Sequence, residues 1–170
     1  MLTIAGFSAC TGDADDVPAA NNVASNGASQ PSSTSEIDIK SLVSVNSDTS
    51  LAMDGISGQP AKPGIPVVIN PKSTPSFAIT GWAVDQQAQT EAGGVIINID
   101  GSKDVLAKYG QPRPDVAAHL KNTKYTNSGF IATMDASSLA KGRHTLTVRV
   151  VTADRKGYFE HKNKYEIEIQ

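Results

Sequence analysis

The sequence predicts an all-β domain, an antiparallel β-sandwich with one short helix. Four segments carry apolar residues at every second position, as strands with one buried face do. These segments are 95–99, 130–134, 146–150 and 165–169. Two dipeptides indicate hairpin turns: Asp100-Gly101, which suits the positive φ angles of a type I′ turn, and Lys156-Gly157. Many short strands with regular turn signals favour two packed sheets.

Weaker strand signals lie in the first half of the chain and after residue 100. They predict five further strands, at 37–45, 51–56, 66–69, 77–85 and 103–109. A helix is predicted between residues 113 and 120, because Pro114 suits the first helical position and Asp115 favours the positive end of the helix dipole. Val116 and Leu120 lie four residues apart, and we expect them to cover one open end of the sandwich.

Composition indicates one folded domain, residues 37–170, which is long enough to bury its own core. A formal net charge of −2 gives no basic footprint for nucleic acid. No apolar run reaches the roughly 18 residues of a transmembrane helix. The single cysteine permits no disulfide within the chain, so stability has to come from burial.

Cys10 follows the residues Phe7-Ser8-Ala9, and this run resembles the lipobox of a bacterial lipoprotein signal. The resemblance implies that residues 1–9 are removed and that Cys10 is acylated. No Lys or Arg precedes Cys10, so we expect the natural start to lie further upstream. Phe7 also departs from the aliphatic residue usual at its position. The alternative is a cytosolic protein with an ordinary cysteine.

Residues 10–36 form the predicted lipidated cysteine and flexible linker. The segment is rich in Ser, Asn, Ala, Thr and Asp and has no aromatic residue, so it cannot bury enough apolar surface to offset its ordering entropy. As a flexible coil it would separate its ends by about 25–30 Å. Thr11, rather than Asp, follows Cys10, and by resemblance to Gram-negative lipoproteins this favours the outer membrane over the inner one.

Several short motifs between residues 77 and 160 occur in the order and spacing of one bacterial module. Together they resemble the immunoglobulin-like β-sandwich of bacterial envelope proteins. The resemblance implies an immunoglobulin-like fold that acts as a spacer or interaction domain, and it carries no catalytic residues. The motifs are Gly81-Trp82-Ala83-Val84-Asp85, Asn98-Ile99-Asp100-Gly101, Tyr109-Gly110-Gln111-Pro112-Arg113-Pro114-Asp115-Val116, Asn127-Ser128-Gly129-Phe130, Gly142-Arg143-His144-Thr145-Leu146 and Gly157-Tyr158-Phe159.

Four motif residues are candidates for a ligand site or a structural network: Trp82, Asp85, Arg113 and Asp115. Trp82 is the sole tryptophan, and we interpret it as a core or sheet-edge anchor rather than an exposed platform. Because Pro114 separates Arg113 from Asp115, we expect the two side chains to diverge. We expect Arg113 to take part in a local ion pair or cap network and to reach a loop carboxylate such as Asp85; the alternative is that it binds an anionic ligand.

Other chemistry lacks a local signature. Asp100 to Asp104 fails the EF-hand template, because Gly stands second and Lys fourth, although a different calcium loop with Asp85 stays open. The three histidines lie in separate elements without zinc spacing: His119, His144 and His161. His144 is expected to be a half-buried packing residue. Ser128 lies outside any nucleophile elbow, and no phosphate-binding loop is present. We therefore predict no catalytic residues, metal or cofactor.

Three function classes remain. The leading hypothesis is a non-catalytic envelope domain, anchored to the membrane through Cys10, that contacts a partner protein or acts as a spacer. The alternative is a module that binds cell-surface glycans, which would need exposed coplanar rings among Trp82, Tyr125, Tyr158, Phe159 and Tyr165. The third is a hydrolase in which His119 or His144 meets a carboxylate and a Ser or Lys in one cleft.

Overall fold

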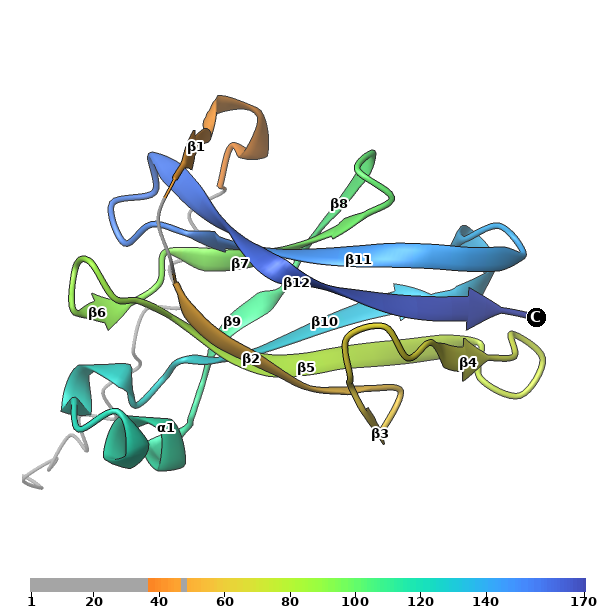
Figure 1. Cartoon of the computed structure of the whole chain (residues 1–170), viewed down its shortest axis with the longest axis horizontal. Coiled ribbons are helices and arrows are strands. Elements are labelled where there is room, and N and C mark those ends of the chain that lie inside the picture. Colours follow the sequence, from red (N-terminus) through yellow and green to blue (C-terminus); the bar gives the residue numbers. More distant parts are fainter. Residues whose placement is uncertain (1–36, 47–48) are drawn as a thin grey trace, which may run out of the picture. The chain divides into compact units, whose positions relative to one another are not determined.

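Two β-sheets packed face to face make up most of the part of the chain that the structure describes (Figure 1). The computed structural model describes residues 37–46 and 49–170. This architecture confirms the all-β sandwich with one short α-helix. The expectations for the signal segment 1–9, for Cys10 and for the linker up to residue 36 lie outside the described residues.

The first sheet has the strand order β1-β12-β11-β7-β8, and β4 also pairs with β12. Its strands are β1 (Val43–Val45), β4 (Val67–Ile69), β7 (Gly94–Ile99), β8 (Lys103–Leu106), β11 (Gly142–Val151) and β12 (Gly157–Ile169). The two longest of them, β11 and β12, pair along most of their length. Residues 152–156 connect them, so the predicted hairpin is present, although Gly157 is already the first residue of β12.

The second sheet has the strand order β3-β2-β5-β10-β9, and β6 also pairs with β5. Its strands are β2 (Ser50–Ile56), β3 (Gln59–Pro60), β5 (Ser76–Asp85), β6 (Thr90–Glu91), β9 (Lys108–Gln111) and β10 (Gly129–Asp135). The helical elements among the described residues are one α-helix and three 3₁₀ helices: α1 (Pro114–His119), η1 (Ile39–Ser41), η2 (Thr123–Tyr125) and η3 (Ala136–Ser138).

Strand pairing is antiparallel except at one edge, where β1 and β4 both run parallel to β12. Alternation in sequence reports which face of a strand is buried, and it does not report the direction of the neighbouring strand. The predicted strand 103–109 also divides. Ala107 is buried and its N–H donates to the carbonyl of Val95 at 2.9 Å, after which the chain crosses from β8 in the first sheet to β9 in the second.

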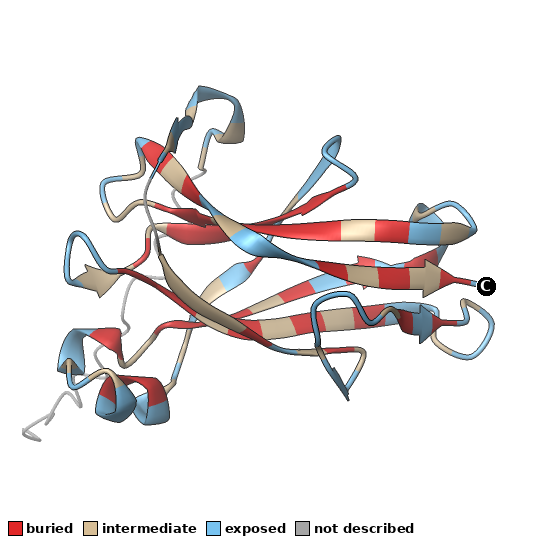
Figure 2. Ribbon diagram, in the orientation of Figure 1, coloured by how far each residue is buried: buried red, intermediate tan, exposed pale blue. Residues whose placement is uncertain are grey.

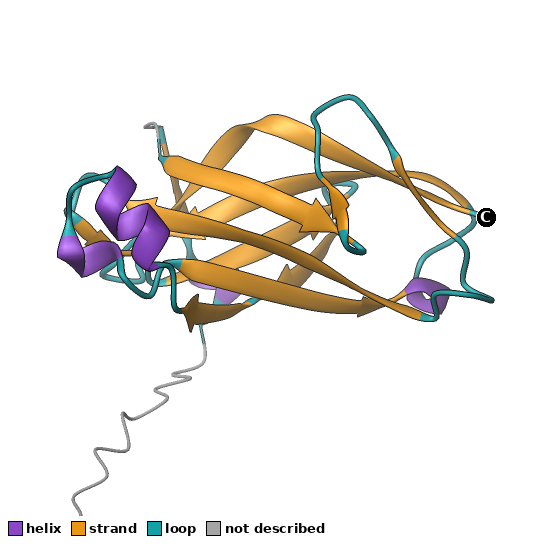
Figure 3. Ribbon diagram, turned by 90° about the horizontal axis from the view of Figure 1, so that it is seen from below, coloured by secondary structure: helices purple, strands orange, loops and turns teal. Residues whose placement is uncertain are grey.

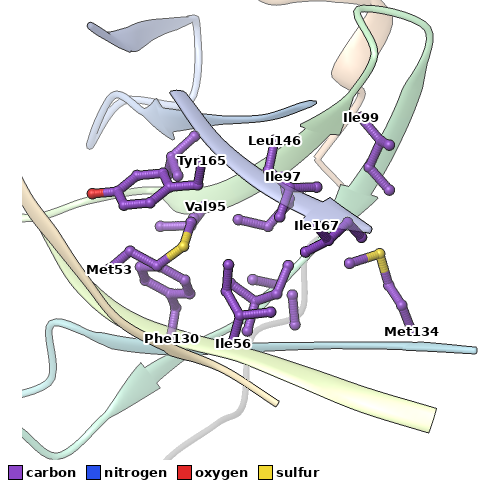
Figure 4. Close-up of a cluster of buried hydrophobic side chains, with 14 of the residues drawn as sticks. Met53, Ile56, Val95, Ile97, Ile99, Phe130, Met134, Leu146, Tyr165 and Ile167 are labelled. Carbon is purple, nitrogen blue, oxygen red and sulfur yellow. The ribbon is translucent and has the colours of Figure 1, made fainter. Parts of the chain in front are cut away.

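The core lies between the sheets and is built from the inward residues of the alternating strands. Buried residues line the facing sides of both layers in Figure 2. Figure 4 shows Ile97, Leu146 and Ile167 from the first sheet meeting Met53, Ile56 and Phe130 from the second. The Asp100-Gly101 turn is as predicted, because its two residues have φ angles of 52° and 72°.

Helix α1 covers the outer face of the second sheet, near one end, rather than the open end of the sandwich (Figure 3). Val116 and Leu120 pack there against Trp82 and Val84 of β5, together with Tyr125. The helix begins with Pro114, as predicted. No helix in the described part of the chain is both long and apolar enough to cross a membrane.

Leu146→Ala should lower the free energy of unfolding by about 2–5 kcal/mol, because Leu146 is fully buried between the sheets and the substitution leaves a cavity. Leu106→Ala is the matched control, since Leu106 is 39% exposed on β8 and should cost within about 1 kcal/mol. Urea denaturation followed by Trp82 fluorescence measures both. Equal losses would contradict the location of the core.

Candidate functional site

Arg113 lies at the centre of a polar cluster on the outer face of the second sheet. Its Nε and Nη2 donate to Oδ1 and Oδ2 of Asp115 at 2.9 and 2.7 Å, and its Nη1 donates to Oδ2 of Asp54 at 2.6 Å. The side chain passes over Gly129, where an added Cβ would lie 2.9 Å from the Cγ of Arg113. The same Cβ would lie 2.9 Å from the Cβ and the carbonyl oxygen of Gln111, so Gly129 leaves room both for the arginine and for the neighbouring strand β9.

Two β-bulges lie in the strands beside this cluster. Asp54 is the extra residue between the pairs Met53–Gly81 and Gly55–Thr80, so its side chain turns toward Arg113. On the other side of the sheet, the register of β9 and β10 shifts at Gly110, which has a φ of +95°. A glycine is favoured there because other residues are strained at this angle.

The expected divergence of Arg113 and Asp115 is wrong, and so is the expected pairing of Arg113 with Asp85. Pro114 begins α1, so Asp115 lies in the first helical turn and its carboxylate folds back onto the guanidinium. The loop partner is Asp54 instead. Asp85 is buried, and its two oxygens accept the N–H groups of Ala88 at 3.0 Å and Ala153 at 2.9 Å. It therefore joins two loops at one end of the sandwich.

The charges of the Arg113 cluster favour a structural role. One guanidinium faces two carboxylates, so the three groups together carry a net charge of −1. The hydrogen bonds from Arg113 lower the pKa of Asp115 to about 2, and Asp115 with Asp54 raises the pKa of Arg113. An anionic ligand would have to displace a carboxylate from Arg113. The adjoining groove of about 220 Å³, lined by Thr80 and Ile131 among others, therefore lacks an available cation at Arg113.

Trp82 anchors a second apolar cluster rather than the main core. It is half-buried on the outer face of β5 and packs with Val84, Val116 and Tyr125. Its neighbour Gly81 leaves room for Phe130, since a Cβ there would lie 2.7 Å from the ring. The interpretation as an anchor fits this position, because the ring holds α1 and η2 against the sheet.

A matching arginine cluster on the first sheet escaped the sequence analysis. Arg149 donates from Nε to Glu160 and from Nη1 to Asp104, each at 3.1 Å, and lies 5.0 Å from the ring centre of Tyr158. Asp104 also accepts from Asn98 at 2.6 Å. These groups join β7, β8, β11 and β12. Their meeting depends on strand register, which alternation alone does not reveal.

His144 forms an ion pair rather than a simple packing contact. Its Nδ1 lies 2.7 Å from Oδ2 of Asp100, and its Nε2 lies 2.7 Å from the carbonyl oxygen of Ala140. Both partners are acceptors, so the doubly protonated imidazolium fits best. The hydrogen bond to Ala140 and then that to Asp100 raise the pKa of His144, while His144 lowers the pKa of Asp100. Because Nε2 faces a carbonyl, it is not placed to activate a hydroxyl nucleophile.

The aromatic rings do not form one exposed platform. Tyr125, Phe159 and Tyr165 are buried, which leaves Trp82 and Tyr158 partly exposed. These two rings belong to different sheets and lie on their outer faces. Within residues 37–46 and 49–170, no three His, Cys, Asp or Glu side chains gather in a way that could hold a metal ion.

A hollow of about 570 Å³ lies at the end of the sandwich where β12 begins. Its walls include Val43 and Val45 of β1, the buried Asp85, and Thr152 and Lys156 of the β11–β12 turn. Both oxygens of Asp85 are already bonded to backbone N–H groups. The hollow therefore offers mainly the apolar side of β1 as a contact surface.

No protein-family model matches the sequence, and no curated protein is similar to it. A solved endo-β-1,4-mannanase from Thermotoga petrophila resembles 74% of the chain with a TM-score of 0.44 and 6% identity. The matched part is 20% of the mannanase chain. A resemblance this weak says nothing about what the chain binds or whether it catalyses a reaction.

Arg113→Lys should lower the free energy of unfolding by about 1–2 kcal/mol, because an ammonium group cannot reproduce the forked bonds to Asp115 and the bond to Asp54. Arg143→Lys is the matched control. Arg143 is 60% exposed and has one 3.5 Å contact with Glu166, so its replacement should change stability by less than about 0.5 kcal/mol. Urea denaturation tests both. If Arg113→Lys leaves the free energy of unfolding unchanged, the cluster does not stabilise the fold.

Stability should depend on pH through His144 and Asp100. The folded pKa of His144 lies above its ordinary 6.5, so its contribution is complete below pH 6.5 and is lost as the pH rises through the folded value. The folded pKa of Asp100 lies below 3.8, so its contribution is present above pH 3.8 and is lost as the pH falls through that folded value. The pair is therefore fully effective between these limits.

His144→Gln should remove the loss of stability on the alkaline side and cost about 1–3 kcal/mol at pH 6. His119→Gln, at an exposed residue of α1, is the control and should keep the alkaline loss. The free energy of unfolding between pH 5 and 9 is the measurement. If the His144→Gln variant still loses stability as the pH rises, a group other than His144 causes that loss.

Proposed function

We propose that the chain is a non-catalytic, lipid-anchored domain of the bacterial cell envelope that holds a contact surface away from the membrane. The observation that most supports this proposal is that β12 extends from one end of the sandwich to the other. This strand has 13 residues and so extends about 40 Å. β1 pairs with its first residues, while Gln170 follows its last. A chain that is anchored upstream of β1 is attached at this end of the sandwich, so the opposite end is free to face away from the membrane.

The engagement of the polar groups supports a mechanical role over a catalytic one. Arg113 and Arg149 are each neutralised by two carboxylates, and both ring nitrogens of His144 face acceptors. Asp85 is bonded to two loops. Each of these groups joins separate strands or loops, which suits a rigid spacer or an interaction scaffold.

The anchor part of the proposal rests on the sequence around Cys10. Several acyl chains on one residue give firm membrane attachment where a single chain is marginal. The predicted linker of residues 11–36 would add about 25–30 Å between the lipid and the sandwich. Linker and domain together would reach a partner protein well clear of the headgroups.

A partner search tests the contact function. Full-length chain cross-linked in intact envelopes should recover a protein partner, and recovery should drop when residues 14–33 are deleted, because the shortened linker no longer reaches it. Recovery of no protein from envelopes in which the chain is abundant would leave the spacer role and contradict a protein–protein contact.

Labelled palmitate should enter the full-length chain, expressed with a complete upstream leader, and Cys10→Ala should abolish both the label and membrane fractionation. Thr11→Asp is the informative control: it should keep the label and move the protein toward the inner membrane, by resemblance to Gram-negative lipoproteins. If Cys10→Ala fractionates like the wild type, the anchor is elsewhere or absent.

A further inference from the structure

The segment of residues 37–45, which we call the strap, is held weakly by the rest of the domain. It contains η1 and β1, and none of its residues is buried. Val43 is 67% exposed. Segments with few buried contacts open at low free-energy cost compared with global unfolding. The strap can therefore leave and return while the sandwich stays folded.

The surface under the strap is nevertheless shaped for it. At Gly157, an added Cβ would lie 2.7 Å from the carbonyl oxygen of Val43 and 2.8 Å from the Cγ2 of Val45. At Gly94, an added Cβ would lie 2.5 Å from the Cδ1 of Ile37. Two glycines thus leave hollows that these side chains and this backbone occupy. We call this surface, formed by Gly94, Gly157 and the β11–β12 turn, the strap groove.

Backbone pairing gives the strap groove a defined register. Val43 pairs with Gly157 and Val45 with Phe159, in parallel, and the N–H of Val43 donates to the carbonyl of Lys156 at 3.1 Å. Val45 also packs against the edge of the main core. A segment that enters this groove is therefore selected both by main-chain hydrogen bonds and by the small spaces above the glycines.

Packing between the strap and the neighbouring loops is incomplete. The 570 Å³ hollow is lined by Val43 and Val45 on one side and by residues of the β5–β6 and β11–β12 turns on the other. Four residues, 46–49, connect β1 to β2. The strap thus precedes all other described strands, and moving it requires no other strand to unpair.

We propose that the strap is exchanged between two copies of this chain, so that each strap occupies the strap groove of the other. A second copy is the fitting occupant because it carries the sequence for which Gly94 and Gly157 leave room. Exchange of an identical element closes a two-fold pair and leaves neither groove empty. The strap makes the same contacts in the groove of a second copy as in its own, so the entropy of association and the protein concentration determine how much exchanged pair forms. Exchange does not require acylation of Cys10.

Mixed-chain cross-linking tests the exchange. Two full-length chains are prepared with Cys10→Ser, one with Ser44→Cys in the strap and the other, of different mass, with Lys156→Cys beside the groove. With a short bismaleimide, the mixture should give heterodimer whose yield rises with protein concentration. Lys72→Cys replaces Lys156→Cys in the control, because Lys72 is exposed near the opposite end of β12. We expect about tenfold more heterodimer with Lys156→Cys than with the control.

The doubly substituted chain, Ser44→Cys with Lys156→Cys, reports the unexchanged state, in which the strap occupies the groove of its own chain. If this chain cross-links only within itself, and the mixture gives no heterodimer above the Lys72→Cys control at any concentration, strap exchange is refuted. Gly157→Ala should abolish the heterodimer in the mixture, since its Cβ occupies the space of Val43 and Val45. Far-UV circular dichroism confirms that this variant is folded. The first comparison uses an unaltered groove glycine, so it decides the question even if Gly157→Ala unfolds.

Discussion

Burial of the inner faces between the two sheets is the interaction on which the rest of the structure depends. Ile97, Leu146 and Val148 are fully buried there, and each such side chain contributes about 1.5–3 kcal/mol. An exposed ion pair contributes at most about 1 kcal/mol. With one cysteine in the chain, no disulfide can supplement this burial within the molecule. Packing of the inward residues therefore holds the two sheets together. The polar clusters add smaller contributions to a fold that this burial already stabilises.

The outer faces show how these clusters contribute. Arg113 joins β2 to the start of α1, and Arg149 joins β8 to β12 through Asp104 and Glu160. The stem of Arg113 passes over Gly129, and each guanidinium joins two carboxylates that belong to different elements. Glycines and bulges give the Arg113 side chain its path. These clusters hold the less buried elements, the helix and the edge strands, against sheets that the core already stabilises.

Local sequence patterns predict the strands with clear alternation, the Asp100-Gly101 turn and the start of α1, because each of these features depends on residues that are close together in the chain. It also selected Arg113 and Asp115, yet it mistook their geometry, since the first helical turn brings Asp115 back toward Arg113 across Pro114. Asp54 had no signal of its own: it reaches Arg113 only because a bulge in β2 turns it outward. The ion pair of His144 with Asp100 joins residues 44 positions apart.

The sequence by itself determined that this chain makes a β-sandwich, because period-two burial is a local property of each strand and follows from the alternation of side chains across the pleat. The tertiary structure alone decided which strands are neighbours, that β1 and β4 run parallel to β12, and which carboxylates meet Arg113 and Arg149. Those facts depend on sheet order and register. Both arise from contacts between segments far apart in the chain, which no local pattern records.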